Sequence, residues 1–395
     1  MAKSRTSKKS SSKAGKRPSN EIRKDSNERK QPVDASPEEE EYPAPSRLSI
    51  VLRSMMSNAL FFFVIMITRI RAPVKLVPRN VIEQNGASWI RLRDGRALEY
   101  VECGDPQGKA LLAFPGYLQT AFSFKAPGFC EGAKEQNIRM ISPSLPGFGY
   151  SDSFFPNETR KLTDWPDVMN QLTTSLDIEN FYCLGLSFGA MHCAVLAAKV
   201  PERVLGAALV SSTAPLDLDN QNVSARIPAV SRFFRRVMAK QWIGDFLAWV
   251  FSKLPTKAKV NSGSPDLWKQ LEKMQHMDYI SLATRQHILK DMDRSINHTW
   301  RGITDNMRVV NEPWGFDVEE VEELVKEGKK VVVSGAKDDS VNPIEVAQWL
   351  HHRIKGSSFL EYEQGWNHFA FYAPKNFKLT LTALIEHEES CNGGE

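Results

Sequence analysis

The sequence predicts an α/β fold, with a mostly parallel central sheet, helices on both faces and an inserted helical segment. From about residue 89 onward, short apolar runs alternate with segments of helical periodicity, which is the pattern of a parallel sheet. Three polar motifs each follow one of these runs, at the edge where open α/β sheets place their sites. Between residues 216 and 315 the alternation gives way to long helical patterns, which indicates the insertion.

The composition is that of a soluble globular protein. Of 395 residues, 42% are hydrophobic and 25% are charged, and the net charge is only +4, so nothing indicates a nucleic-acid partner. The five cysteines are odd in number and lack paired spacing, which argues against a disulfide framework and against a zinc site. Two of them, Cys183 and Cys193, are expected to fill space in the core. We expect no metal and no other cofactor.

The first 70 residues predict a tail and a membrane anchor. Residues 1–46 are rich in Lys, Arg, Ser, Glu and Pro, cannot bury enough apolar surface, and are expected to be disordered. Residues 47–70 contain an uncharged apolar run and are just long enough to span a bilayer, with Arg53 near one end. We expect a single N-terminal anchor here. A helix on the membrane surface and a helix packed against the domain are the alternatives, and the sequence assigns no compartment.

The domain that follows begins with a pair of strands. Residues 89–93 and 98–102 flank an Asp-Gly turn, which is a hairpin signal. A helix is expected over 165–176, where apolar residues recur at helical spacing, and a strand is expected at 206–210. The expected division of the domain is a first part of the core at 71–215, the helical insertion at 216–315 and a second part of the core at 316–395.

The most informative motif is Gly-Leu-Ser-Phe-Gly at residues 185–189. It follows the apolar run 181–184 and opens a small-residue segment that is typical of a helix. A strand, a tight turn and a helix form the context in which such a pentapeptide presents a serine nucleophile. Because a serine hydroxyl is a weak nucleophile, it needs a histidine to take its proton. Ser187 is therefore the candidate nucleophile if a histidine and a carboxylate follow.

Both partners occur downstream, each after a predicted strand. The β-branched run 331–333 is followed by Asp338 and Asp339. The short strand 359–362 is followed by Gly-Trp-Asn-His-Phe, which contains His368. Serine, acid and histidine thus occur in the chain order that such a turn requires.

Together these motifs resemble the α/β-hydrolase fold family of serine hydrolases, over residues 89–385. Residues 111–117 resemble the family's strand and oxyanion loop, and residues 142–151 resemble its Pro-Gly-x-Gly-x-Ser turn. Two positions depart from the family pattern, because Pro115 stands where histidine is usual and Ser144 stands where aspartate is common. The resemblance implies that the helical insertion is a cap over the active site.

The resemblance also implies the roles of the site residues. Ser187 is the expected nucleophile and His368 the general base. Asp338 fits the family's G-x-x-D-x-x-V-x-P spacing and is the expected acid, which holds the imidazole and stabilises its charged form. The backbone N–H groups of Tyr117 and Phe188 are the expected oxyanion donors.

Three other carboxylates are alternatives for the acid. Asp339 is the immediate neighbour of the preferred residue, and Asp217 or Asp219 follows the preceding core strand, where some members of the family carry the acid. Among the other histidines, His192 is expected to pack on the helix after the elbow. The vicinal pair at 351–352 suggests a metal site, but neighbouring positions on a helix point apart, so we assign it no metal.

The expected activity is hydrolysis of an ester or thioester bond in a small apolar acyl or lipid-like substrate, through an acyl-enzyme. Serine rather than aspartate at the elbow argues against epoxide hydrolase and dehalogenase chemistry. The cap segment carries apolar helical faces beside basic residues, which fit either a lipid surface or a cover for the hydrolase core. The alternatives are an acyltransferase that uses the same triad and a non-catalytic binding protein on a hydrolase fold.

Overall fold

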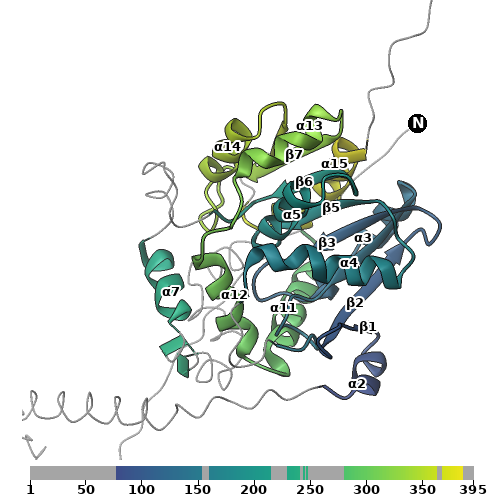
Figure 1. The fold of residues 1–395 in the computed structure, drawn as a ribbon, viewed down its shortest axis with the longest axis vertical. Coiled ribbons are helices and arrows are strands. Elements are labelled where there is room, and N and C mark those ends of the chain that lie inside the picture. The colour runs from purple at the N-terminus through teal and green to yellow at the C-terminus, as the bar shows by residue number, and fades with distance from the viewer. Residues whose placement is uncertain are drawn as a thin grey trace, which may run out of the picture. The chain divides into compact units, whose positions relative to one another are not determined.

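The described residues form one eight-stranded sheet (Figure 1). The structure is a computed structural model that describes residues 77–153, 160–214, 229–240, 280–362 and 367–385, with the short pieces 243–244 and 246–247. The strand order is β1-β2-β4-β3-β5-β6-β7-β8. The pairs β1–β2 and β2–β4 are antiparallel, and the six strands from β4 to β8 are parallel to one another. The strands are β1 (Ser88–Arg91), β2 (Ala97–Gly104), β3 (Lys109–Phe114), β4 (Ile138–Pro143), β5 (Phe181–Leu186), β6 (Val204–Val210), β7 (Lys330–Ala336) and β8 (Ser358–Tyr362).

The predicted hairpin is confirmed at one edge of this sheet. β1 and β2 pair with Trp89 opposite Glu99, and the N–H of Leu92 donates to the carbonyl of Arg96 at 2.8 Å across the turn. Gly95 in this turn has φ +87°, a conformation that glycine adopts at little cost. The parallel part of the sheet is also confirmed, and its central strands are buried along almost their whole length, which explains their continuous apolar sequence.

Helices cover both faces of the sheet. α15 lies on one face, because a Cβ added to Gly206 of β6 would meet Leu384 at 3.2 Å and Tyr182 at 3.3 Å. Side chains alternate along β5, so Gly185 faces away from Tyr182, and a Cβ there would meet Ala190 of α5 at 2.5 Å. α5 therefore lies on the opposite face. The described α-helices are α2 (Arg79–Gln84), α3 (Phe129–Glu135), α4 (Trp165–Ser175), α5 (Phe188–Lys199), α7 (Ala229–Ala239), α11 (Leu282–Asn297), α12 (Arg301–Asn311), α13 (Glu322–Lys326), α14 (Ile344–Arg353) and α15 (Pro374–Ile385).

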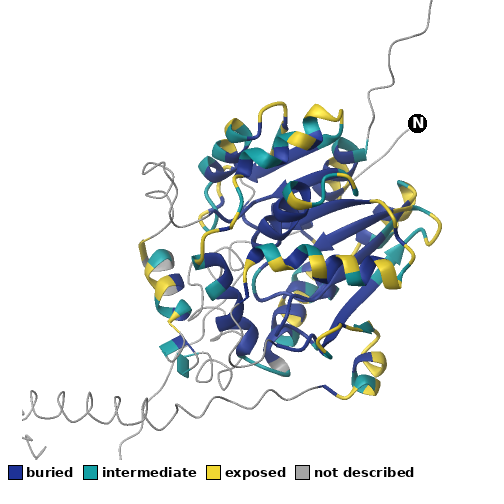
Figure 2. Ribbon diagram, viewed as in Figure 1, coloured by how far each residue is buried: buried dark blue, intermediate teal, exposed yellow. Residues whose placement is uncertain are grey.

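The core lies between the sheet and these two helical layers, and the central strands β3, β5, β6 and β7 are buried along almost their whole length (Figure 2). On the face of α15, Phe129 of α3 stacks on Phe377 with ring centroids 4.0 Å apart. On the face of α5, the predicted amphipathic helix is confirmed as α4, and it buries Trp165, Met169 and Leu172. Aromatic and aliphatic side chains thus fill both layers, which fixes the strand ends that carry the site.

The first turn of α12 is in direct backbone contact with the loop after β4. A Cβ on Gly147 would lie 2.6 Å from the Cα of Gly302, and a Cβ on Gly302 would lie 2.3 Å from the carbonyl oxygen of Gly147. Neither position has room for a side chain. One turn later, Asn306 donates from Nδ2 to the carbonyl of Pro146 at 3.0 Å. These contacts hold α12 against the loop that leaves β4.

Three expected segments, the tail, the anchor and the cap, fall wholly or partly outside the described residues. The described pieces of the expected cap, 216–315, are helical and include α7, α11 and α12. The expected tail at 1–46 and anchor at 47–70 lie outside the described residues, as do Asp217 and Asp219. Within the part that is described, no helix combines the length and the apolar character needed to cross a bilayer.

The cysteines correct one expectation. Cys103 at the end of β2 and Cys130 in α3 form a disulfide, with Cα atoms 5.3 Å apart. Their separation of 27 residues gave no spacing signal, because the two residues meet only once α3 packs beside β2. Cys183 and Cys193 are free and buried beside the elbow, as expected.

Candidate active site

The turn between β5 and α5 is a strained elbow that presents Ser187. Ser187 has φ +54° and ψ −113°, and its N–H donates to the carbonyl of Val210 at 2.7 Å. The flanking glycines are required by close approach. A Cβ on Gly185 would lie 2.2 Å from the carbonyl oxygen of Gly189, and one on Gly189 would lie 2.1 Å from that of Phe114. The expected strand–turn–helix context of the motif is therefore confirmed.

His368 is paired with Asp339, not with Asp338. The distance between His368 Nδ1 and Asp339 Oδ2 is 2.7 Å, and both side chains are buried. Asp338 is exposed on the turn that follows β7. The expectation that Asp338 holds the histidine is thus corrected by one position, in favour of the neighbouring alternative.

The loop after β7 explains why Asp339 is the residue that reaches inward. β7 ends at Ala336, and the N–H of Asp339 donates back to the Ala336 carbonyl at 3.2 Å, which closes a turn. Oδ1 of Asp339 then accepts hydrogen bonds from the N–H groups of Val341 and Asn342, each at 2.8 Å. One carboxylate oxygen is held by the backbone, and the other is aimed at His368. These bonds fix the orientation of the carboxylate.

Ser187 and His368 line the same cavity of about 60 Å³. Among the described residues, the hydrogen-bond partner of Ser187 Oγ is Asn342, whose Nδ2 lies 3.2 Å away. The sequence analysis did not single out Asn342, which stands between Val341 and Pro343 in the acid motif. The described residues around the cavity come from the loops after β3, β5, β7 and β8 and from α11: Gly116, Tyr117, Gln119, Leu186, Ser187, Met292, Val341, His368, Phe369 and Tyr372.

Two backbone N–H groups lie beside the elbow, that of Tyr117 in the loop after β3 and that of Phe188 at the start of α5. In the described part of the chain, no acceptor pairs with the backbone N–H of Tyr117 or of Phe188. The rings of these two residues pack together, with centroids 5.6 Å apart, so the two segments are in contact. Leu118 has φ +59°, which turns the chain sharply after Tyr117. Backbone N–H groups without an acceptor, on two segments that are in contact beside a serine, can hold a developing oxyanion.

A series of side-chain hydrogen bonds connects the loop after β3 to the loop that carries His368. Gln119 accepts from the N–H of Gly116 at 3.0 Å through Oε1, and its Nε2 donates to the hydroxyl of Tyr372. That hydroxyl also pairs with Ser123. Tyr372 follows His368 by one turn of chain, in a short 3₁₀ helix, Ala370–Tyr372. At Pro115, where the family usually has histidine, the loop is therefore held by Gln119 instead.

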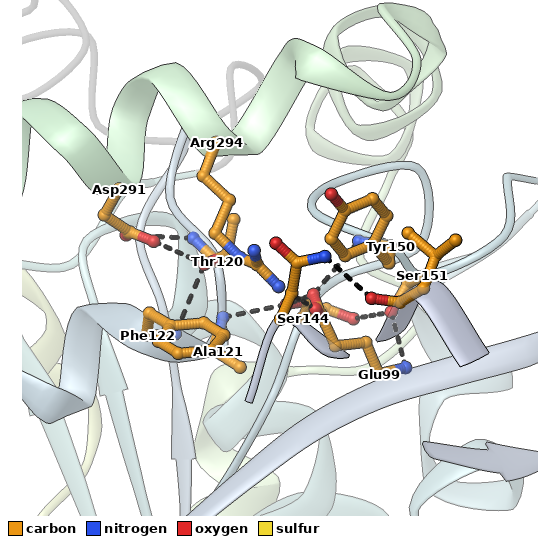
Figure 3. A network of polar contacts seen from close by, with 11 residues as sticks. Glu99, Thr120, Ala121, Phe122, Ser144, Tyr150, Ser151, Asp291 and Arg294 are labelled. Atoms are coloured by element: carbon orange, nitrogen blue, oxygen red, sulfur yellow. Dashed lines mark hydrogen bonds and ion pairs between the residues drawn. The ribbon is translucent and has the colours of Figure 1, made fainter. Parts of the chain in front are cut away.

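The second departure from the family pattern, Ser144, has a similar explanation (Figure 3). Glu99 of β2 is fully buried, and its Oε2 accepts from Ser144 Oγ at 2.7 Å and from the N–H of Tyr150 at 3.0 Å. Its Oε1 pairs with Arg294, which extends from α11 between the rings of Phe122 and Tyr150. A carboxylate is thus present beside residue 144, but it comes from the neighbouring strand.

A second buried carboxylate, that of Asp291 in α11, is bonded to the loop after β3. Asp291 accepts from the N–H of Thr120 at 3.0 Å and from its hydroxyl, so α11 is bonded to the loop that carries Tyr117 (Figure 3). Burial raises the pKa of Asp291 to about 7, although the bonds from Thr120 and the charge of Arg294 act in the opposite direction. No local sequence pattern predicts this contact, since the two residues are 171 positions apart.

The other histidines that the sequence analysis singled out lie in helices, His192 in α5 and the pair at 351–352 in α14. His192 packs on α5, as expected, where Nδ1 lies 3.2 Å from the Phe188 carbonyl and Nε2 lies 3.0 Å from Arg160. Burial, with the charge of Arg160, holds the pKa of His192 well below its usual range. The pair at 351–352 lies in the last turn of α14. Among the described residues, no group of three His, Cys, Asp or Glu side chains could hold a metal ion.

Comparison with known proteins identifies the architecture. Residues 109–373 match the family model of the alpha/beta hydrolase fold. The chain is similar in structure to a hydrolase from Pseudomonas aeruginosa PA01 (13% identity, 76% of this chain and 98% of that chain, TM-score 0.55). It is also similar to the esterase RhEst1 from Rhodococcus sp. ECU1013 (18% identity, 75% and 96%, TM-score 0.53) and to a thioesterase domain from the curacin biosynthetic pathway (13% identity, 76% and 99%, TM-score 0.51). No curated protein gave a significant match in sequence.

Proposed function

The chain belongs to the alpha/beta hydrolase family, and we propose that it is a serine hydrolase that cleaves carboxylic esters or thioesters through Ser187, His368 and Asp339. The observation that carries the proposal is the 2.7 Å contact between His368 Nδ1 and Asp339 Oδ2, beside a cavity that Ser187 also lines. A buried carboxylate bonded to Nδ1 fixes the imidazole tautomer that presents Nε2 as a base. These three residues are the minimum that nucleophilic acyl transfer requires.

In the first half of the reaction, Ser187 Oγ attacks the carbonyl carbon of the substrate while His368 Nε2 takes the hydroxyl proton. The carbonyl oxygen gains the negative charge, and the N–H groups of Tyr117 and Phe188 stabilise it. When the tetrahedral intermediate collapses, the bond to the leaving oxygen or sulfur breaks. His368 gives its proton to that atom, and the acyl group stays on Ser187.

In the second half, water replaces the leaving group. His368 takes a proton from the water as the water oxygen attacks the acyl carbon, and the same two N–H groups hold the second oxyanion. Collapse releases the carboxylic acid and returns the proton to Ser187 Oγ. Throughout, Asp339 holds the imidazole through its Nδ1–H and stabilises the imidazolium that forms twice in each cycle.

An apolar acyl group is the proposed substrate moiety. Leu186, Met292, Val341 and Phe369 contribute apolar side chains to the cavity around the serine. Such a lining favours an aliphatic or aromatic acyl chain over a charged one. The esterase and the thioesterase domain to which the chain is similar give the two bond types to be tested.

Labelling by a fluorophosphonate probe tests the proposal. We expect the wild-type protein to be labelled and to hydrolyse p-nitrophenyl esters, and Ser187→Ala to lose both properties while it keeps the wild-type melting temperature. Ser211→Ala is the matched control, because Ser211 is a buried serine next to the elbow whose Oγ lacks a partner among the described residues. If the wild type is inert towards the probe, the chain is a non-catalytic member of the fold. If product analysis gives an acylated acceptor alcohol in place of the acid, the enzyme is an acyltransferase.

We also propose that residues 47–70 attach the protein to a membrane, on the basis of their length and uncharged centre alone. The full-length protein is then expected in the membrane pellet after washing with high salt and with carbonate. Removal of residues 1–70 is expected to release a domain that still hydrolyses small esters, because the three site residues lie downstream. Extraction of the full-length protein by carbonate would contradict an embedded anchor.

A further inference from the structure

We propose that Asn342 is a further catalytic residue, whose side-chain amide orients Ser187 Oγ and stabilises the charge that develops on it. The inference rests on the proposed function. Asn342 touches both ends of the triad: its Nδ2 lies 3.2 Å from Ser187 Oγ, and its backbone N–H donates to Asp339 Oδ1 at 2.8 Å. One residue therefore joins the nucleophile to the acid without passing through His368.

The orientation of the amide is set by chemistry. Nδ2 of Asn342 lies 2.8 Å from the carbonyl oxygen of Ser211, which can only accept, so the NH₂ group and not the oxygen faces that side. Ser211 is itself held, because its N–H donates to the Ser334 carbonyl at 2.8 Å and its φ is +43°. The second hydrogen on Nδ2 is then left for Ser187 Oγ.

This arrangement decides where the proton of Ser187 points. A hydroxyl has one hydrogen and two lone pairs, and Asn342 supplies a donor, so Ser187 Oγ acts as acceptor on that side. The O–H of Ser187 therefore cannot donate to Asn342 and points to another acceptor. His368, which lines the same cavity, is the base that takes it.

The amide also favours the reacting state over the resting state. When Ser187 Oγ loses its proton to His368 Nε2 and begins its bond to the acyl carbon, it carries partial negative charge. A hydrogen bond to a charged acceptor is roughly twice as strong as one to a neutral acceptor. Because the gain appears only during bond formation, removing the amide should lower kcat and leave KM unchanged.

Three substitutions separate this role from a structural one. All keep the backbone N–H that Asp339 uses. Asn342→Ala removes both side-chain bonds, Asn342→Asp keeps the shape but replaces the donor by a negative oxygen, and Asn342→Thr keeps a single donor hydrogen, which cannot serve Ser187 and Ser211 together. Asn376→Ala is the matched control, since Asn376 is a buried asparagine whose Nδ2 donates to a backbone carbonyl, that of Ala370, at 3.0 Å.

The experiment measures kcat and KM for a p-nitrophenyl ester, the rate of fluorophosphonate labelling and the melting temperature for each variant. We expect Asn342→Ala to lose about tenfold in kcat and in labelling rate, with KM within about twofold, and Asn342→Asp to lose more than Asn342→Ala. The kcat and the labelling rate of Asn342→Thr should be close to those of Asn342→Ala and not to those of the wild type. Asn376→Ala should lower the melting temperature and leave the labelling rate unchanged.

Three results would overturn the inference: a kcat within twofold of wild type in Asn342→Ala, a loss confined to KM, or a rate loss in Asn376→Ala equal to that in Asn342→Ala. Should Asn342→Ala fail to fold, the isosteric Asn342→Asp and Asn342→Thr, whose side chain has a similar volume, carry the same comparison. A wild type that resists the probe removes the proposed function and this inference together. A wild type that reacts, beside variants that react equally fast, removes the inference alone.

Discussion

His368 and Asp339 form the 2.7 Å contact that Asp338, one residue earlier, does not make. Asp339 is buried and Asp338 is exposed, so the two neighbours have different surroundings although they share one turn. The pair therefore provides a direct test of which carboxylate supports the histidine, with each variant serving as the control for the other.

We predict that Asp339→Asn lowers kcat by on the order of 10³- to 10⁴-fold, because an amide at this position no longer stabilises the imidazolium or selects its tautomer. Asp338→Asn should keep kcat within about twofold of wild type, since surface substitutions away from a site have small effects. Both values come from steady-state kinetics with a p-nitrophenyl ester. Equal losses of kcat in the two variants would contradict the assignment of the acid role to Asp339 alone.

The buried carboxylate of Glu99 gives a prediction about stability. Glu99→Ala leaves Arg294, Ser144 and the N–H of Tyr150 without their acceptor and should lower the free energy of unfolding by about 3–5 kcal/mol. Glu102→Ala, on the same strand, should cost about 1 kcal/mol or less, because Glu102 pairs with Arg139 near the surface. Urea denaturation measures both.

The same contact predicts a rescue. Ser144→Asp restores a carboxylate where the family commonly has aspartate, so it should recover part of the stability lost in Glu99→Ala. In the wild-type background it should destabilise the protein, because two buried carboxylates would then face each other. Additive effects of the two substitutions would show that Glu99 and residue 144 do not share this role.

The raised pKa of Asp291 predicts how the free energy of unfolding depends on pH. Its pKa is about 7 in the folded protein against 3.8 for a free side chain, so between about pH 4 and pH 7 the unfolded chain releases a proton that the folded protein keeps. Stability then falls as pH rises through this window, by about 1.4 kcal/mol per pH unit, and levels off above it. Asp291→Asn lacks this titration, and an amide can still accept from Thr120.

The measurement is urea denaturation of the wild type and of Asp291→Asn from pH 5 to pH 9. The stability of Asp291→Asn relative to wild type should rise from pH 5 to pH 7 and stay constant from pH 8 to pH 9. A difference that is the same at every pH would mean that the residue 291 carboxyl titrates alike in the folded and unfolded states.

The disulfide predicts a difference between two sets of thiols. In the folded protein, Cys103 and Cys130 should resist alkylation until a reductant is added, whereas Cys183 and Cys193 should react once the protein is unfolded, without reductant. Mass spectrometry of alkylated peptides reads both. The double change Cys103→Ser and Cys130→Ser should lower the free energy of unfolding by about 3 kcal/mol, from the loop that the bond closes. Alkylation of Cys103 in unreduced native protein would contradict the bond.

The strong local patterns of the sequence were enough to predict the framework of the fold. The hairpin at 89–102, the elbow at Ser187 and the helix beginning at Trp165 each depend on residues that are neighbours in the chain, so periodicity and turn chemistry identify them. The same holds for His368, which follows a strand and a glycine. Such features require no knowledge of which elements pack together.

The rest of the site depends on contacts between distant segments. Glu99 and Ser144 are 45 residues apart, and Asp291 and Thr120 are 171 apart, so no local pattern joins them. The family spacing ranked Asp338 ahead of Asp339, and that prediction was wrong, because a shift of one residue in a turn exchanges an exposed side chain for a buried one. The bond between Cys103 and Cys130 likewise depends on how α3 packs beside β2.

The backbone contact between Gly147 and Gly302 limits which amino acids can replace either residue during evolution. Since a Cβ on either residue would come within 2.6 Å of the other segment, neither can mutate to any other amino acid while α12 keeps its place. Replacing either glycine therefore requires α12 or the loop after β4 to shift, so we expect both positions to stay glycine in any homologue that places α12 against this loop.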